Sequence, residues 1–185
     1  EHAASQSNDS KSNTTAEISA PTQDKPKVYH ASRTVLTDLI STKLEVSFDW
    51  TKSWLIGKET LQAKPHYYAS NELILDAKGM EIKQVSMAGK TLVYDYKDDV
   101  LTIKLDKTYT RDENYTVVID YIAKPDERET GGSKAITSDK GLYFINPRGE
   151  EPNKMPQIWT QGETESNSVW FPTIDSPNSK TKQEI

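Results

Sequence analysis

A glutamine and a glutamate two positions apart, Gln161 and Glu163, are the residues whose types and spacing best suit ligand chemistry. In an extended segment, side chains two apart point the same way, so we expect the amide and the carboxylate to project together. Gly162 between them has no side chain and lets a ligand or another backbone come close. A carboxylate beside an amide can receive a cationic ammonium group and hydrogen-bond next to it. The spacing therefore predicts a site for a positively charged amine.

The segment that follows, residues 170–177, combines apolar anchors with turn-forming residues. Trp170 and Phe171 offer large apolar area for packing, and Pro172 fixes the backbone beside them. Asp175–Pro177 is typical of a turn, because aspartate and serine side chains bond to nearby backbone groups. We expect this segment to hold the predicted amine site in place.

These two segments together resemble the signature that closes the N-terminal β-domain of aminopeptidase N-type zinc peptidases, of the gluzincin class. Upstream, Gly141–Tyr143 is similar to the Gly-(Leu/Phe)-Tyr of that family. Matching motifs are closely spaced over residues 139–178, whereas residues 30–138 resemble the family only in their general pattern. The signature reads Gln-x-Glu, seven residues, then Phe-Pro-x-x-Asp-x-Pro, and the residues in register with it are Gln161, Glu163, Phe171, Pro172, Asp175 and Pro177.

Three positions of the signature region depart from the usual family pattern. Ser168 stands where arginine is common, Thr173 where cysteine is common, and Ser176 where glutamate is common. These departures bear on local supporting contacts rather than on the ammonium-binding position.

The resemblance implies that the complete protein is a zinc-dependent aminopeptidase, which removes N-terminal residues from peptides by means of a zinc-bound water. In that family the Gln-x-Glu segment lines the catalytic cleft. The resemblance assigns Glu163 to the free α-ammonium of the substrate and Gln161 to the border of S1, the pocket for the first side chain. Peptide N-termini are the expected partners, bound together with a catalytic domain.

The zinc ligands and catalytic residues of that family do not occur in this chain. His2, His30 and His66 are far apart, and none belongs to a His-Glu-x-x-His pair. That pair and a distant glutamate supply the zinc ligands and the general base. The Gly-x-Met-Glu-Asn exopeptidase motif is missing too, and Gly79–Glu81, which is nearest to it, predicts an ordinary turn into a strand. We therefore expect no catalytic residue and no metal ligand here, and zinc as a cofactor bound outside this chain.

Apolar and polar residues alternate with a period of two from about residue 28 onward. Such alternation is typical of half-buried strands, and short strands separated by turn residues indicate an all-β fold. The prediction is one domain over residues 28–185, an antiparallel β-sandwich or a curved, saddle-like sheet. Lys97–Asp99 predicts a tight hairpin, Gly57 a β-bulge, and Thr164–Ser168 one helical turn. Strands are expected at Leu44–Phe48, Trp54–Ala63, Leu73–Leu75, Ile82–Met87, Thr91–Tyr96, Val100–Leu105, Tyr115–Tyr121, Leu142–Ile145 and Pro156–Thr160.

Both ends of the chain carry further expectations. Residues 1–27 contain Ile18 as their only large apolar residue, which predicts a disordered linker, because such a segment cannot bury enough surface to offset its ordering entropy. A first residue other than methionine, before a Ser/Asn/Thr-rich spacer, favours a periplasmic or secreted location, with a lipid anchor or without one, over a cytoplasmic one. Residues 180–185 resemble the start of another strand, so we interpret the chain as the front part of a longer enzyme. An unfinished sheet edge there would allow self-association.

Composition excludes several other classes of protein. The net charge is −5 and no basic stripe is present, which argues against nucleic acid as a partner. No apolar segment is long enough to span a membrane, and the absence of cysteine excludes disulfides and thiolate metal sites. The alternative function is a carbohydrate- or protein-binding β-sandwich module of a secreted protein, using some of the four Trp and nine Tyr residues. Trp50, Trp54 and Trp159 are expected in the core or on a sheet face.

Overall fold

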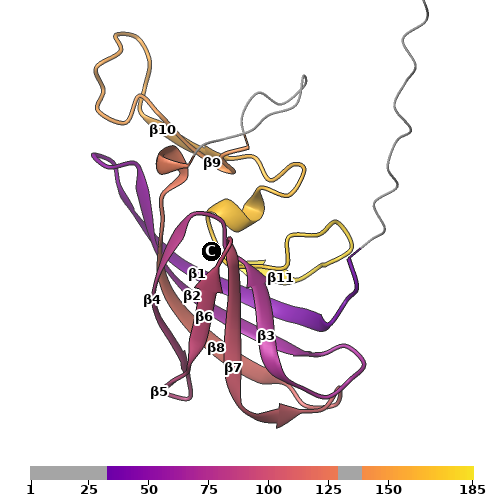
Figure 1. Cartoon of the computed structure of the whole chain (residues 1–185). Coiled ribbons are helices and arrows are strands. Elements are labelled where there is room, and N and C mark those ends of the chain that lie inside the picture. The colour runs from indigo at the N-terminus through magenta and orange to yellow at the C-terminus, as the bar shows by residue number, and fades with distance from the viewer. Residues whose placement is uncertain (1–32, 129–138) are drawn as a thin grey trace, which may run out of the picture. The chain divides into compact units, whose positions relative to one another are not determined.

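Strands are the main secondary structure in the part of the chain that the structure describes. The computed structural model describes residues 33–128 and 139–185, and the linker predicted over residues 1–27 lies outside that part (Figure 1). Two short 3-10 helices interrupt the strands, η1 (Pro125–Glu127) and η2 (Asn167–Val169). The prediction of an all-β fold is confirmed. The strands are β1 (Thr37–Asp49), β2 (Trp54–Pro65), β3 (Ser70–Asp76), β4 (Met80–Met87), β5 (Lys90–Thr91), β6 (Tyr94–Lys97), β7 (Val100–Tyr109), β8 (Tyr115–Ala123), β9 (Leu142–Ile145), β10 (Gln157–Thr160) and β11 (Lys182–Glu184).

The strands form three sheets, none of which closes into a barrel. The largest has six strands in the order β11-β1-β2-β8-β4-β5, a second has the order β3-β7-β6, and β9 and β10 form a separate hairpin. In Figure 1 the three-stranded sheet lies in front of β2 and β8. All pairs are antiparallel except β1 and β11, which run parallel. The predicted hairpin between β6 and β7 is confirmed, with Asp98 and Asp99 both at positive φ, as a two-residue type I′ turn requires.

The core lies between the six-stranded and three-stranded sheets. Along β8, every second residue is buried and the residues between are at least partly exposed, which is the alternation that the sequence predicted. The opposing sheet contributes fully buried leucine and isoleucine side chains, among them Leu73, Leu101 and Ile103. Trp170 and Phe171 belong to the same buried cluster, which confirms their predicted packing role.

Gly57 is not at a bulge, contrary to the sequence prediction. It pairs in regular register with Val46 on β1 and with Tyr121 on β8. Instead, the irregularity of the β1–β2 pair lies between Leu39 and Ser41. A Cβ atom at Gly57 would lie 2.3 Å from Cζ of the Tyr121 ring, so the glycine makes room for that ring.

The single strand predicted over Thr91–Tyr96 is two strands in different sheets. β5 ends at Thr91 and pairs with β4, whereas β6 begins at Tyr94 and pairs with β7. Leu92 between them is buried in the core. The apolar pattern therefore continues across the point where the chain leaves one sheet and joins the other, and it does not mark that point. The strand predicted near the C-terminus is present as β11. No helix among residues 33–128 and 139–185 has the length and apolar character needed to cross a membrane.

Candidate functional site

The hairpin of β9 and β10 positions the predicted amine site. Thr160 pairs with Leu142, and the Gln161 N–H donates to the Gly141 carbonyl at 2.9 Å, which extends the ladder by one pair. Leu142 and Phe144 are buried and face the core. Because successive side chains alternate, Gln161 lies on the opposite, outward face of the hairpin.

A closed turn follows the hairpin and projects Glu163. The Ser166 N–H donates to the Gly162 carbonyl at 3.0 Å, and the peptide bond between Glu163 and Thr164 is cis. A Cβ atom at Gly162 would lie 2.4 Å from Oδ1 of Asn167. The close approach predicted at this glycine is therefore made by the Asn167 side chain, which packs against the turn.

Gln161 and Glu163 lie together, as their spacing predicts. Nε2 of Gln161 is 3.4 Å from Oε2 of Glu163, and Glu163 is exposed. Within residues 33–128 and 139–185, no lysine, arginine or histidine forms an ion pair with Glu163. The Gln161 amide thus contacts a carboxylate that is exposed and has no cationic partner in this part of the chain.

Hydrogen bonds anchor the next segment. The N–H and Oγ of Ser168 both donate to Oδ2 of Asp175, each at 2.8 Å. The Asp175 N–H donates to Oδ2 of Asp76 at 3.0 Å, and Asp76 also pairs with Arg33 at 2.6 Å. The site is thus anchored to the end of β3.

Two departures from the family pattern are well supported in the fold. Ser168 is buried and hydrogen-bonded to Asp175, so a serine suffices there. Thr173 exchanges two backbone hydrogen bonds with Asp76, at 2.7 and 2.9 Å, which do not depend on its side chain. The third, Ser176, donates to Oδ1 of Asn178 at 2.5 Å inside the predicted turn.

Zinc does not fit this part of the protein. Among the described residues no group of three His, Asp or Glu side chains could hold a metal ion. Nδ1 of His66 is 2.7 Å from Oδ1 of Asp38, a pair without a third donor. His2 and His30 lie outside the described residues.

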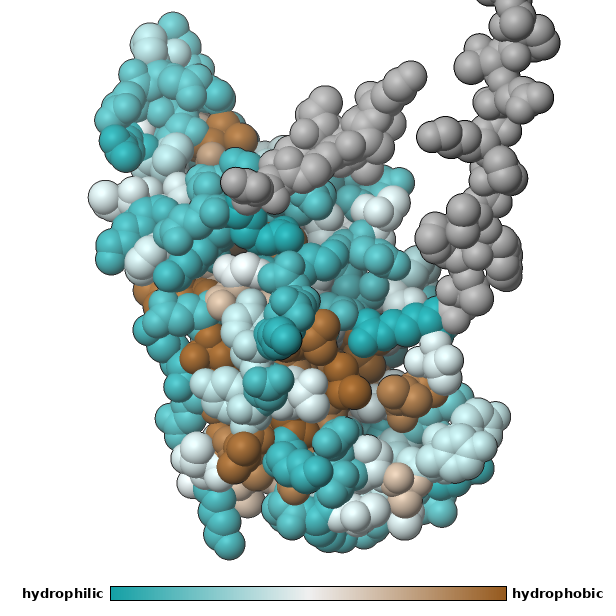
Figure 2. Space-filling model, viewed as in Figure 1, coloured by the Kyte–Doolittle hydropathy of each residue, from teal (hydrophilic) through white to brown (hydrophobic). Residues whose placement is uncertain are grey.

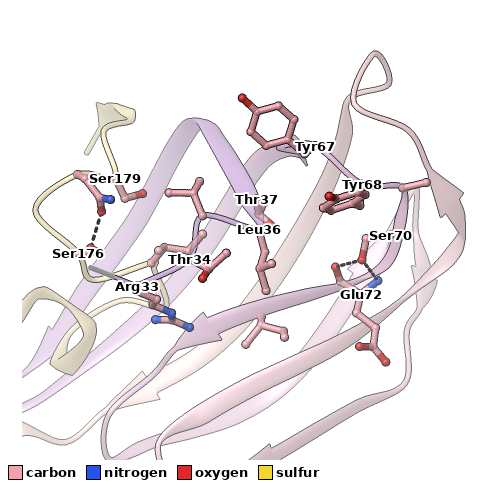
Figure 3. A pocket seen from close by; sticks show the side chains of 15 residues that line it. Arg33, Thr34, Leu36, Thr37, Tyr67, Tyr68, Ser70, Glu72, Ser176 and Ser179 are labelled. Atoms are coloured by element: carbon pink, nitrogen blue, oxygen red, sulfur yellow. Dashed lines mark hydrogen bonds between the residues drawn. The ribbon is translucent and has the colours of Figure 1, made fainter. Parts of the chain in front are cut away.

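A cavity lies away from Gln161 and Glu163. Its volume is about 290 Å³, and it lies between the start of β1, the β2–β3 connection and the turn before β11 (Figure 3). Two of its polar groups already have partners: Arg33 binds Asp76, and Ser176 binds Asn178. Figure 2 shows hydrophobic side chains at the surface near the three-stranded sheet, surrounded by hydrophilic ones. The exposed apolar residues that line the cavity are Val35, Leu36, Tyr67 and Tyr68.

The family profile described as the peptidase M1 N-terminal domain matches residues 25–185. The chain belongs to this family. Membership confirms the resemblance seen in the sequence and supports the peptidase interpretation over that of a carbohydrate-binding module. No curated protein sequence matches the chain.

Solved structures of M1 zinc metallopeptidases and of a leukotriene A4 hydrolase share the fold. The M1 N-terminal domain described above superposes on native LTA4 hydrolase from Saccharomyces cerevisiae with a TM-score of 0.61 and 20% identity, over 80% of this chain and 22% of that one. An M1 zinc metallopeptidase from Deinococcus radiodurans matches with a TM-score of 0.63 and 14% identity, over 83% of this chain and 32% of that one. A two-domain M1 zinc metallopeptidase mutant bound to L-tryptophan matches with a TM-score of 0.66 and 13% identity, over 84% of this chain and 33% of that one. The chain thus spans about a fifth to a third of the length of these proteins.

The sequence prediction missed the residues that support the site of this M1 domain. Asp76 is 99 positions from Asp175, so no local pattern could connect them. Asn167 was not singled out either, although it lies within the turn predicted over Thr164–Ser168. Trp159 does lie on a sheet face, as one of its two expected placements had it, but its position two residues before Gln161 on the outward face of the hairpin was not connected with the site.

Proposed function

We propose that this chain is the non-catalytic N-terminal domain of a zinc aminopeptidase that removes N-terminal residues from peptides. In this proposal Glu163 binds the α-ammonium of the substrate, and Gln161 borders S1, the pocket for the first side chain. The observation that carries the proposal is the exposed Glu163 carboxylate, which the Gln161 amide contacts and which no cation of the described residues pairs with.

The two side chains would divide the work of recognition. The carboxylate accepts a charge-assisted hydrogen bond, which is shorter and about twice as strong as a neutral one. The Gln161 amide donates to Glu163 and keeps its own carbonyl oxygen as a second acceptor for the ammonium protons. Together they would fix the position of a free amine and leave a blocked amine without a partner.

The proposal assigns binding to this chain and the chemical step to the rest of the enzyme. Zinc and its ligands would lie outside this chain, because its sequence holds no His-Glu-x-x-His pair and no group of side chains among the described residues fits a metal. The chain covers only about a fifth to a third of the matched solved structures, which supports this division. What this domain contributes is the orientation of the peptide N-terminus.

Steady-state kinetics on the complete enzyme test the proposal. Glu163→Gln keeps the shape and removes the charge. Losing a hydrogen bond to a charged group costs about 1.5–3 kcal/mol, so kcat/KM for free peptides should fall roughly 10- to 150-fold. Substrates blocked at the amine should show no such loss.

Glu165→Gln is the matched control. Glu165 lies in the same turn and is exposed, and its side chain has no hydrogen bond or ion pair among the described residues. It should change kcat/KM by less than about twofold. If a folded Glu163→Gln enzyme also stays within a factor of about two, the assignment of the amine site is wrong.

A further inference from the structure

The outward face of the β9–β10 hairpin continues from Gln161 into a stacked aromatic pair. Tyr143 and Trp159 are direct partners in the ladder. Their ring centroids are 4.4 Å apart and the ring planes differ by 10°. Trp159 remains 46% exposed although Tyr143 lies along it. A large aromatic surface is therefore held rigidly on the face that carries the proposed amine site.

The spacing along the strand relates this surface to the substrate. Trp159 precedes Gln161 by two residues, and a strand advances about 3.3 Å per residue, so their backbones are roughly 7 Å apart. A phenylalanine or tyrosine side chain reaches about 5–7 Å from its Cα when its bonds are each about 1.5 Å. A first side chain that runs past Gln161 is therefore long enough to meet the Trp159 ring, whereas an alanine side chain is not.

The chemistry of the surface selects among long side chains. Ring pairs gain stabilisation beyond the apolar area that they bury, and they prefer offset-stacked or edge-to-face arrangements. One face of Trp159 is taken up by Tyr143, and the exposed part of the ring offers such an arrangement to a third ring. The stack also limits rotation of the tryptophan, so little side-chain entropy remains to be lost when a ligand binds.

We propose that Trp159, held by Tyr143, is a specificity-determining residue that favours peptides whose first residue is aromatic. This inference rests on the proposed function, because the position of the first side chain follows from the amine at Glu163. The ligand that contacts the Trp159 ring is the first side chain of the substrate, because the aromatic surface and the proposed amine site lie on the same face of the hairpin.

The test compares two substrates in the complete enzyme, one beginning with phenylalanine and one with alanine. Trp159→Ala should lower kcat/KM for the phenylalanine substrate by roughly 3- to 10-fold, the worth of one aromatic pair. The alanine substrate should change by less than about twofold. Trp159→Phe keeps a ring in the stack and should retain most of the preference for the phenylalanine substrate over the alanine one. A variant that failed to fold would lose activity on both substrates.

A second control and a third substrate complete the design. Tyr68→Ala removes an exposed tyrosine, 87% accessible, that lines the cavity away from this hairpin, and it should leave the ratio of the two substrates unchanged. Equal losses for phenylalanine and alanine substrates in Trp159→Ala would overturn the inference. A selective loss for an arginine substrate instead would overturn the aromatic ligand class, since it would indicate a cation–π site.

The two proposals fail in different ways. If Glu163→Gln leaves both substrates unaffected, the amine site is wrong and this inference falls with it. If Glu163→Gln impairs both substrates while Trp159→Ala alters neither or both alike, only the aromatic preference is wrong.

Discussion

Removing the carboxyl group of Glu59 should stabilise the protein, and increasingly so as the pH rises. Glu59 lies in the middle of the six-stranded sheet, opposite Leu44 on β1 and Ile119 on β8, and is fully buried. Neither of its carboxyl oxygens has a hydrogen-bond partner among the described residues. Burial therefore raises the pKa of Glu59 well above its usual value, and the neutral acid is the form that the core accommodates.

A second buried titratable group lies on the same face of the sheet and gives Glu59 no hydrogen bond. Tyr121 lies over Gly57, two residues from Glu59, and its hydroxyl also has no partner in the described part of the chain. Burial raises the pKa of Tyr121, and a negative charge on Glu59 raises it further. Neither group offers the other a compensating charge.

The sign and size of the pH dependence follow from proton linkage. The unfolded chain releases the Glu59 proton near pH 4.3, at about the pKa of a free glutamate. The folded chain keeps this proton to a higher pH because its pKa is raised. Between the two pKa values the unfolded state binds fewer protons, so Glu59 lowers the free energy of unfolding by about 1.4 kcal/mol per pH unit. Below about pH 4 both states are protonated and this contribution disappears.

Urea denaturation at a series of pH values measures the effect. The difference in free energy of unfolding between Glu59→Gln and the unaltered chain should be small near pH 4 and should grow as the pH rises toward about 7. Glu45→Gln is the control, because Glu45 lies on the neighbouring strand β1 with an exposed side chain. Parallel stability curves for Glu59→Gln and the unaltered chain over about pH 4.5–7 would refute the assignment of a buried, unpaired carboxyl.

Two further predictions concern polar groups outside the core. A hydrogen bond from Lys107 at 2.6 Å, followed by bonds from Thr110, lowers the pKa of Glu113 to about 2. A pH titration monitored by NMR of the side-chain carboxyl should give a pKa of about 2 for Glu113, and Lys107→Met should raise that pKa. An unchanged pKa in the variant would show that the lysine contact is not formed. Asp175→Ala removes the acceptor of both Ser168 hydrogen bonds and should lower the free energy of unfolding by about 1–3 kcal/mol, as measured with urea. A loss below about 0.5 kcal/mol would mean that Asp175 does not hold the segment.

Local patterns in the sequence predicted what local interactions determine. The alternation from Tyr115 to Tyr121 and the Asp98–Asp99 turn each reflect a backbone preference that acts within a few residues, and both were located correctly. The passage from β5 to β6 was missed because Leu92 stays buried whichever sheet the chain follows. Apolar periodicity reports burial, and it does not report which sheet supplies the neighbours.

The candidate site divides in the same way. Gln161 and Glu163 were predicted to lie together from side-chain alternation in an extended segment, and they are in contact. The strand ends at Thr160, however, and Glu163 lies in the turn that follows it. The tie from Asp175 to Asp76 joins positions 99 residues apart, so only the folded sheet could reveal it. Glu59 stands in an alternating run where an apolar residue is expected, and a charge-bearing residue in that register was the one local sign of the buried carboxyl.

The turn from Gly162 to Ser166 is fixed at both of its ends. The bond between Gln161 and the Gly141 carbonyl fixes its start, and the Lys78 N–H, which donates to the Ser168 carbonyl at 2.7 Å, fixes its exit. Thr164 and Glu165 between these points are exposed and contribute nothing to the core. These two positions are therefore suited to randomised libraries, because they can carry new charges or bulk beside the proposed amine site while the hydrogen bonds at both ends of the turn stay in place. The surroundings of the proposed amine site and the stability of the fold can then be varied separately.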